Sequence, residues 1–385
     1  MWRVLLLALC AVAIALLGFS LIDSNGGGEV GATALLVDVN TDSSGFARAL
    51  APWEWQFPRD HGPHPAFQTE WWYYTGNVAT ADGRRFGYQF TVFRRAISPT
   101  AARSESEWRS DQIYMAHFTV SDISGQRFYH DERYSRGAAE LAGASSDPVY
   151  RVWLEDWQVI ALNADATQTQ ISADAGTFAV TMTLQQVKPP ALQGDNGLSA
   201  KSATPGNASY YYSLSRLVTE GSMRIGGESF AVSGYTWMDH EFSTSALGSD
   251  ALGWDWFGLI FDNNTELMVG QIRLVDGERE PYFGGLYVRE DGSTVYLDAA
   301  DFTITALDTW TSPHTAAVYP SGWEIVVTLP DSAPLRLTLT PLLRDQELHN
   351  GAIAYWEGAV QIGGDLSGYG YAELTGYADT MTGRF

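Results

Sequence analysis

Apolar and polar residues alternate in short runs along most of this chain, and a turn signal follows most of these runs. The pair Glu70–Val78 and Arg84–Arg95 illustrates the pattern: Phe86 and Tyr88 fall on one face of the second run, and Asp82-Gly83 separates the two runs. Alternation with a period of two is typical of a β-strand, and Asp-Gly between two such runs favours a tight turn. These residues therefore predict a β-hairpin.

The same pattern recurs to the end of the chain. Further predicted hairpins are Ile113–Ser121 with Gln126–Arg133, Gly221–Ile225 with Ser229–Trp237, Trp254–Phe261 with Leu267–Val275, Tyr282–Arg289 with Thr294–Leu297, Trp323–Leu329 with Leu335–Leu343, and Tyr355–Ile362 with Tyr369–Tyr377. No stretch shows the periodicity of a long amphipathic helix. Regular strands joined by short turns predict an all-β protein, and hairpin-linked meanders favour barrels.

The N-terminal segment has a different composition. Arg3 precedes the apolar run of residues 4–22, and Ala32-Thr33-Ala34 offers small residues at the spacing that a signal peptidase accepts. Residues 1–34 are therefore predicted to be either a signal peptide or a membrane anchor. Both alternatives place the remaining chain outside the cytoplasm, as a periplasmic, extracellular or membrane-anchored protein.

Size and charge narrow the function classes. The 385 residues fit two average domains, and the 45% hydrophobic fraction provides for packed cores. The net charge of −22 excludes nucleic acid as a partner, because binding to phosphates needs a basic surface. Cys10, inside the apolar N-terminal run, is the only cysteine, so the chain can form no internal disulfide and no thiolate metal site.

Cofactor and metal motifs are absent from the sequence. We find no phosphate-binding glycine loop, no dinucleotide fingerprint, no nucleophile elbow and no His-Glu-x-x-His. His61 and His64 lie in a proline-rich loop without a nearby third ligand, which argues against a metal. The prediction is a protein without cofactor or metal.

The densest group of reactive side chains lies between Gly234 and Phe261. Asp239, His240 and Glu241 are consecutive, and in a strand the two acids point to one face and the histidine to the other. A carboxylic acid buried among indoles tends towards a raised pKa and can then donate a proton at neutral pH. The same charges would also fit a solvated strand end, so both interpretations stay open.

Two further groups of aromatic residues accompany acids. Asp255 lies between Trp254 and Trp256, and alternation places the acid on the face opposite to the two indoles. Glu70 begins the run Trp71-Trp72-Tyr73, where a carboxylate must reach either solvent or a partner.

These motifs together resemble a known family, the AttH-like lipocalin-like group, which is related to carotenoid 1,2-hydratase (hydroxyneurosporene synthase) and kievitone hydratase. The resemblance covers nearly all of the chain after the N-terminal segment. It rests on Phe57-Pro58-Arg59-Asp60-His61-Gly62, Glu70-Trp71-Trp72-Tyr73, Trp237-Met238-Asp239-His240-Glu241, Gly253-Trp254-Asp255-Trp256-Phe257, Tyr355-Trp356-Glu357-Gly358 and Tyr371-Ala372-Glu373-Leu374-Thr375-Gly376-Tyr377. It implies two tandem lipocalin-like barrels, which we place at residues 45–245 and 246–385.

The resemblance implies three functions for a hydrophobic ligand such as an isoprenoid or lipid. The first is acid-catalysed addition of water to an alkene, the second is a lipid carrier or accessory protein beside an ABC-type transporter, and the third is cyclase-like shaping of a substrate. Resemblance to the group also fits a secreted hydrolase. In the hydratase branch, a histidine and an aromatic residue two positions on are tied to activity, and His240 and Phe242 match them. The tyrosine–aspartate pair of that branch has no counterpart, since Phe261-Asp262 stands there.

For hydration, we expect Asp239 or Asp255 to be the acid and His240 or Glu241 to position water. The expected ligand-binding residues are Glu70, Trp71, Trp72, Tyr73, Trp237, Trp254 and Trp256, with Arg59 and His61 in support. For a carrier, the acids would instead be structural and would join the two domains through pairs such as Arg59 with Glu70 or Asp239.

Overall fold

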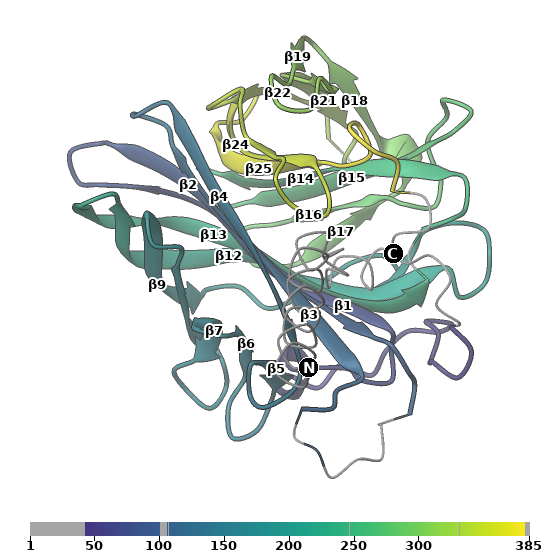
Figure 1. Ribbon diagram of the computed structural model, residues 1–385. Helices are drawn as coiled ribbons and strands as arrows, with labels where there is room; N and C mark the ends of the chain where they lie inside the picture. The colour runs from purple at the N-terminus through teal and green to yellow at the C-terminus, as the bar shows by residue number, and fades with distance from the viewer. Residues whose placement is uncertain (1–42, 101–105, 107, 246, 331, 382–385) are drawn as a thin grey trace, which may run out of the picture.

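The computed structural model describes residues 43–100, 106, 108–245, 247–330 and 332–381. Two large antiparallel sheets each curl into a nearly closed barrel (Figure 1). The predicted all-β fold with two tandem barrels is therefore confirmed. The predicted signal or anchor segment, residues 1–34, lies outside the described residues. Among the described residues, no helix has the length and apolar character needed to cross a membrane.

The first sheet runs in the order β4-β3-β2-β1-β13-β12-β9-β8-β7-β6-β5, and β10 and β11 pair with β12. Its strands are β1 (Thr69–Ala79), β2 (Arg85–Ala96), β3 (Gln112–Asp122), β4 (Arg127–Arg136), β5 (Ala142–Ser145), β6 (Arg151–Leu154), β7 (Trp157–Ala161), β8 (Gln168–Asp174), β9 (Phe178–Gln186), β10 (Ala191–Leu192), β11 (Leu198–Ala200), β12 (Ala208–Ile225) and β13 (Glu228–Ser245). A short 3-10 helix, η2 (Arg59–His61), precedes β1.

The second sheet has the order β17-β16-β15-β14-β25-β24-β22-β21-β18, with β23 paired to β24. Its strands are β14 (Ala251–Phe261), β15 (Glu266–Leu274), β16 (Gly285–Val288), β17 (Thr294–Leu297), β18 (Phe302–Ala306), β21 (Trp323–Val327), β22 (Leu335–Pro341), β23 (Glu347–Leu348), β24 (Tyr355–Gly364) and β25 (Gly368–Leu374). The edge strands β17 and β18 are consecutive and joined by the 3-10 helix η3 (Ala299–Asp301). β19 (Thr309–Thr311) and β20 (Val318–Pro320) form a separate hairpin.

The aromatic run of β1 explains how the two barrels meet. Trp72 and Tyr74 belong to the core inside the first barrel, whereas Tyr73 belongs to a separate cluster between the barrels. A strand with apolar residues on both faces is covered on both sides. Here the second cover is the other barrel, because β1 and β13 pack against β25 and β14. We call this contact region the seam.

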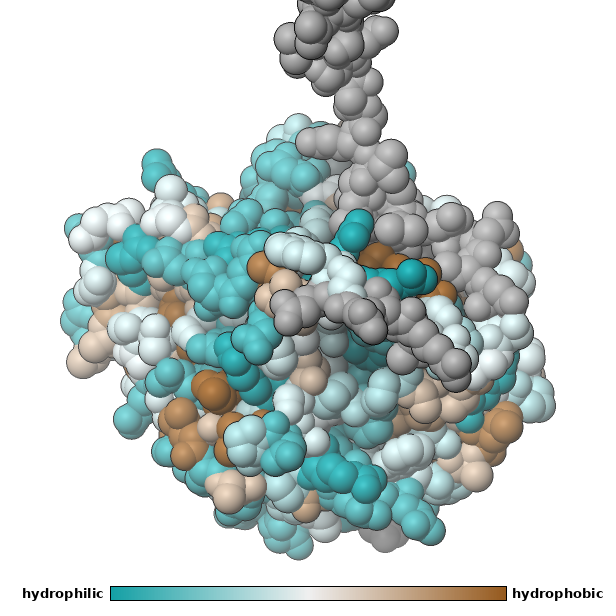
Figure 2. Space-filling view, turned by 60° about the horizontal axis from the view of Figure 1, so that its bottom comes forward, coloured by the Kyte–Doolittle hydropathy of each residue, from teal (hydrophilic) through white to brown (hydrophobic). Residues whose placement is uncertain are grey.

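The seam has its own aromatic core, separate from the cores of the barrels. Its buried members are Tyr73, Tyr211, Trp237, Trp256, Met268, Ala359 and Tyr371. On the face shown in Figure 2, hydrophobic residues form only small groups among hydrophilic ones. The contact between the barrels thus buries aromatic side chains that a single barrel would expose to solvent.

Candidate active site

A pocket of about 80 Å³ lies in the seam, at the end of the strands where the acids of the first barrel face the indoles of the second. Its lining comes from both barrels: Trp71, Tyr73, Phe93, Lys201, Tyr211, Asp239, Glu241, Leu247, Trp254, Trp256, Ile272, Phe283 and Glu373. Most of these side chains are apolar or aromatic, with a few converging polar groups. That composition is typical of a small-molecule site.

Asp239 is fully surrounded on the first-barrel side of the pocket. Its Oδ1 accepts hydrogen bonds from Ser213 Oγ (2.5 Å) and Trp237 Nε1 (2.8 Å), and its Oδ2 accepts one from Tyr211 Oη (2.7 Å). Burial raises the pKa of Asp239 to about 7, against the lowering effect of these donors and with a further raising effect of Glu241. Three donors that favour the charged form make this carboxyl a proton acceptor near neutral pH.

Glu373 faces the pocket from β25 of the second barrel and is held less firmly. In the described part of the chain its single hydrogen-bond donor is Trp254 Nε1, 3.0 Å from Oε2. Burial raises the pKa of Glu373 to about 7, and the charges of Asp239 and Glu241 raise it further. Because no described residue donates a hydrogen bond to Oε1 of Glu373, this carboxyl can carry a proton towards the pocket.

One ion pair lies at the edge of the same pocket. Lys201 Nζ is 2.8 Å from Glu241 Oε1, and it stands 4.4 Å from the centroid of the Phe283 ring and 5.2 Å from that of Tyr211. The chain has only two lysines, and Lys188 is fully occupied in a separate buried contact with Glu266. Lys201 therefore offsets part of the charge of Glu241. The proton chemistry of the pocket is left to Asp239 and Glu373.

A further acid lies behind the pocket wall. Tyr73 Oη donates to Glu357 Oε1 at 2.5 Å. Burial and the nearby Glu373 raise the pKa of Glu357 well above its ordinary value. Glu357 thus holds the Tyr73 hydroxyl from the second barrel.

The raised pKa values predict a specific dependence of stability on pH. A carboxyl whose pKa rises from near 4 in the unfolded chain to about 7 in the folded one stabilises the fold at low pH, and this contribution is lost as the pH rises to about 7. The double variant Asp239→Asn/Glu373→Gln lacks both titrations. Urea unfolding gives the free energy of unfolding of both proteins at each pH. The wild-type value minus the variant value should fall between about pH 4 and pH 7 and then stay level. A difference that does not change with pH would contradict the two raised pKa values.

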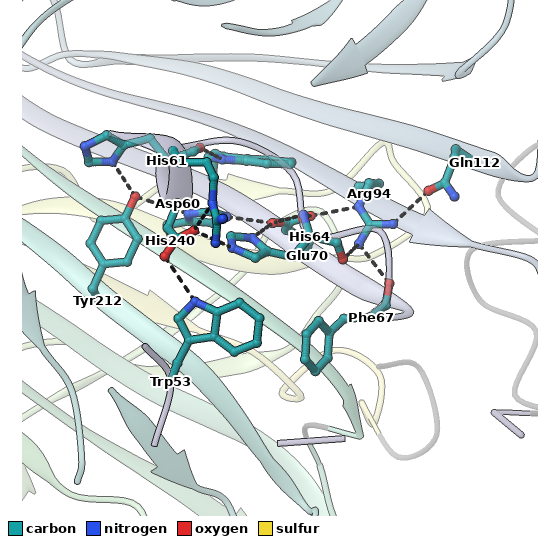
Figure 3. A network of polar contacts seen from close by, with 12 residues as sticks. Trp53, Asp60, His61, His64, Phe67, Glu70, Arg94, Gln112, Tyr212 and His240 are labelled. Atoms are coloured by element: carbon teal, nitrogen blue, oxygen red, sulfur yellow. Dashed lines mark hydrogen bonds and ion pairs between the residues drawn. The ribbon is translucent and has the colours of Figure 1, made fainter. Parts of the chain in front are cut away.

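His240 lies on the opposite face of β13, inside the first barrel, in a buried polar network around Glu70 (Figure 3). His240 Nε2 and His64 Nδ1 approach Glu70 Oε1 at 2.9 Å and 2.8 Å, and Arg94 Nε donates to Oε2 at 2.9 Å. Arg94 also donates to the carbonyls of His64 and Phe67. The network thus ties the loop before β1 to the end of the first barrel.

Charges in this network are set by their partners. Burial alone would raise the pKa of Glu70, but Arg94, His240 and His64 hold it well below its usual range. The pKa of His64 is raised, because Asp60 and Glu70 outweigh its burial. Burial lowers the pKa of His240, and burial together with His240 lowers that of His61 to about 3.

The same network contains a group of possible metal ligands. One ligand atom each of His64, Glu70 and His240 lies within 4.8 Å of the others. However, the guanidinium of Arg94 already neutralises the carboxylate, and both imidazoles use the facing nitrogen for their hydrogen bond to it. These residues satisfy one another, so we assign them a structural role.

The structure divides the residues proposed from the sequence. It brings Asp239, Glu241, Trp71, Tyr73, Trp254 and Trp256 together at the pocket. Trp237 lies behind Asp239 as its hydrogen-bond donor. The structure places four other proposed residues in the interior of the first barrel: Glu70, Trp72, His61 and His240. There, Tyr212 Oη contacts both His61 and His240.

Two other proposed residues lie away from the pocket. Asp255 points to the face opposite its neighbouring indoles, and Gln271, Arg273 and Tyr377 hydrogen-bond to it. Arg59 is largely exposed and pairs with Asp60. The suggested pairing of Arg59 with Glu70 or Asp239 is wrong, because the register of β1 and β2 sets Arg94 opposite Glu70.

Sequence reasoning missed Glu373, Tyr211 and Lys201 as pocket residues. Glu373 had a detectable signal: it is the one acid in the predicted run Tyr369–Tyr377, inside one of the motifs of the resemblance. Tyr211 and Lys201 carried none, since their place in the pocket depends on how the barrels meet.

Comparisons with known proteins agree with this architecture. The model of the AttH-like family matches residues 48–377. A crystal structure of a putative AttH from Nitrosomonas europaea is 32% identical, covers 86% of this chain and 100% of its own, and gives a TM-score of 0.76. Kievitone hydratase from Nectria haematococca is 15% identical over 90% and 98% of the two chains, with a TM-score of 0.62. CghA, solved with Sch210972, is 12% identical over 88% and 98%, with a TM-score of 0.52.

At the identities of the last two structures, the likeness shows the shared fold alone. A search of curated protein sequences finds no match.

Proposed function

We propose that this chain, which belongs to the AttH-like family, adds water to an alkene of a hydrophobic molecule bound in the seam, outside the cytoplasm. One observation carries the proposal: two carboxyls whose pKa is about 7, Asp239 and Glu373, face one aromatic pocket. Enzymes that perform acid and base chemistry at neutral pH commonly tune carboxyl groups to this range.

In the proposed reaction, the protonated Glu373 is the acid and the ionised Asp239 is the base. The proton of Glu373 and the alkene π electrons form a new C–H bond, which leaves a carbocation on the neighbouring carbon. A water oxygen bonds to that carbon, and the water gives up a proton to Asp239. Exchange with solvent then returns Glu373 to its protonated form and Asp239 to its ionised form.

The pocket walls suit the intermediate of this reaction. Trp71, Trp254 and Trp256 present indole rings to the pocket, and Phe283 and Tyr211 add two further rings. Aromatic faces attract a cation, by about 2 kcal/mol where water is excluded. The neutral alkene and the carbocation both make apolar contacts with these rings, but only the carbocation gains the attraction to the aromatic faces. The walls therefore stabilise the carbocation more than the substrate.

A stable cation of the same shape should therefore bind more tightly than the substrate. For a tertiary amine that replaces the cationic carbon, we expect about tenfold or stronger inhibition than for its neutral hydrocarbon counterpart. Trp254→Leu should remove most of this preference, because it removes a ring and keeps an apolar wall. Inhibition constants of the two compounds on both proteins give the result. Equal inhibition by amine and hydrocarbon in the wild type would contradict a cationic intermediate.

A non-enzymatic carrier is the second function that the apolar lining supports. Mass spectrometry of an organic extract from the purified full-length chain, with an empty-vector control, tests the shared requirement for a hydrophobic ligand. We expect an isoprenoid or lipid to co-purify with the protein. It should be present as the alkene substrate, as the hydrated product, or as both. If the ligand co-purifies with the wild type but not with the Trp254→Leu/Trp256→Leu variant, its binding site lies in the seam. An extract with no more ligand than the control would oppose the carrier function, because a carrier retains its ligand whereas an enzyme releases its product.

A further inference from the structure

A second cavity, of about 200 Å³, lies at the opposite end of the seam from the pocket. On β1, Trp71 and Tyr73 line the pocket, whereas Thr75, Asn77 and Ala79 line this cavity. Alternate residues of a strand share one face, so the two sites follow each other along the same face of β1. Residues of β14 and β25 complete the lining from the second barrel. We call this second site the polar cavity, because polar side chains from both barrels line it.

Two buried polar atoms of the lining residues have no partner. Thr75 Oγ1 and Asn77 Oδ1 make no hydrogen bond within the part of the chain that the structure describes, although Asn77 Nδ2 donates to the carbonyl of Gly370 at 2.9 Å. A buried polar atom without a partner costs free energy, and proteins rarely leave one unpaired. The cavity therefore offers a hydroxyl that can donate or accept and an amide oxygen that accepts.

Opposite charges lie at the rim of the polar cavity. The guanidinium of Arg85 lies 3.8 Å from the centroid of the Tyr369 ring, and no carboxylate among the described residues pairs with it. Asp262, which is exposed, comes from the second barrel, and its Oδ2 accepts a hydrogen bond from the Ser367 hydroxyl at 2.6 Å. One positive and one negative group in the same lining favour a ligand without net charge.

Aromatic rings form the remaining walls of the polar cavity. The lining contains one indole and three phenol rings: Trp237, Tyr235, Tyr369 and Tyr371. The face of an aromatic ring is negative, so it attracts the weakly positive C–H groups of a saturated ring. A hydrocarbon would bind poorly, because it would strip water from the polar groups and return no hydrogen bonds. A saturated ring with C–H groups on its faces and hydroxyls on its edge suits both parts of the lining.

We propose that the polar cavity binds one neutral sugar ring, such as a hexose or its glycoside. Two hydroxyls of the sugar pair with Thr75 Oγ1 and Asn77 Oδ1, a third accepts a hydrogen bond from Arg85, and the C–H face of the ring packs on the aromatic walls. The pocket and the polar cavity have no lining residue in common. Sugar binding is therefore independent of the hydration proposed for the pocket.

Titration of the full-length chain with the methyl glycosides of glucose, galactose and mannose, followed by saturation-transfer difference NMR, tests this site. We expect saturable binding of at least one glycoside. Thr75→Val keeps the shape of the side chain without its hydroxyl and should weaken the affinity about 2- to 10-fold, and Arg85→Met should weaken it about 10- to 100-fold. Thr169→Val on β8 and Arg127→Met on β4 lie outside the cavity and should bind like the wild type.

A variant that fills the polar cavity locates the bound sugar. Ala79→Phe places a ring in the cavity and should abolish binding, whereas Trp254→Leu, which changes the pocket, should leave the affinity as it is. Circular dichroism of each variant verifies its fold. The proposal would be overturned if none of the glycosides bound the wild type saturably, or if Thr75→Val and Arg85→Met left the affinity unchanged. Binding that Trp254→Leu removes and Ala79→Phe keeps would overturn it as well, because the sugar would then lie in the pocket.

Discussion

Replacement of Glu373 by glutamine is expected to lower the turnover number for alkene hydration by about 10²- to 10⁴-fold, the range that a positioned general acid contributes. The amide can keep the hydrogen bond with Trp254 but has no acidic proton to deliver. Ligand affinity should change little, because the rings of the pocket supply most of the contact. Turnover numbers and binding constants of the two proteins, measured with the alkene that co-purifies, give the result.

Glu280→Gln is the matched control for this substitution. Glu280 is also buried with a raised pKa, but it does not line the pocket. We expect the control variant to keep wild-type turnover. If Glu373→Gln kept it too, Glu373 would not be the acid; if both variants lost it, the effect would be a general one of removing a buried carboxyl.

Replacement of Arg94 by methionine is expected to destabilise the fold by about 3–5 kcal/mol, because it leaves the buried charge of Glu70 without its cation. Both side chains are almost completely inaccessible to solvent, at 1% and 0% exposure. The loss also frees the carbonyls of His64 and Phe67 and the amide oxygen of Gln112. Urea unfolding at neutral pH measures the effect.

The double variant Arg94→Met/Glu70→Gln should recover part of this stability, since it removes the unpaired charge as well. Arg344→Met is the surface control: its ion pair with Asp308 is exposed on both sides, and solvent screening leaves it little influence on the midpoint. If the urea midpoint of Arg94→Met lay as close to the wild-type midpoint as that of Arg344→Met, a structural role for the Glu70 network would be contradicted.

Alternation of residues was sufficient to predict the fold class and the direction of many side chains. It placed Asp239 and Glu241 on one face and His240 on the other, and it separated Asp255 from Trp254 and Trp256; the structure has these same faces. These features are local, because a strand fixes the direction of each side chain relative to its neighbours.

The composition of the pocket could not be predicted in the same way. Asp239 and Glu373 are more than a hundred positions apart in the sequence, and they meet because β13 and β25 lie on facing walls of different barrels. The partner of Glu70 was missed for a related reason. Arg59 is closer in sequence, but strand register sets Arg94 directly opposite. Sequence alone does not reveal register or the faces through which two barrels pack.

The most direct test of the central claim is incubation of the wild type with its co-purified alkene in water that carries a heavy oxygen isotope. We expect an alcohol whose new hydroxyl oxygen comes from this water, formed by the wild type and by Glu280→Gln but not by Glu373→Gln. Recovery of the alkene unchanged, or of a product without the label, would contradict hydration in the seam and would favour a protein that carries its ligand or reshapes it without water.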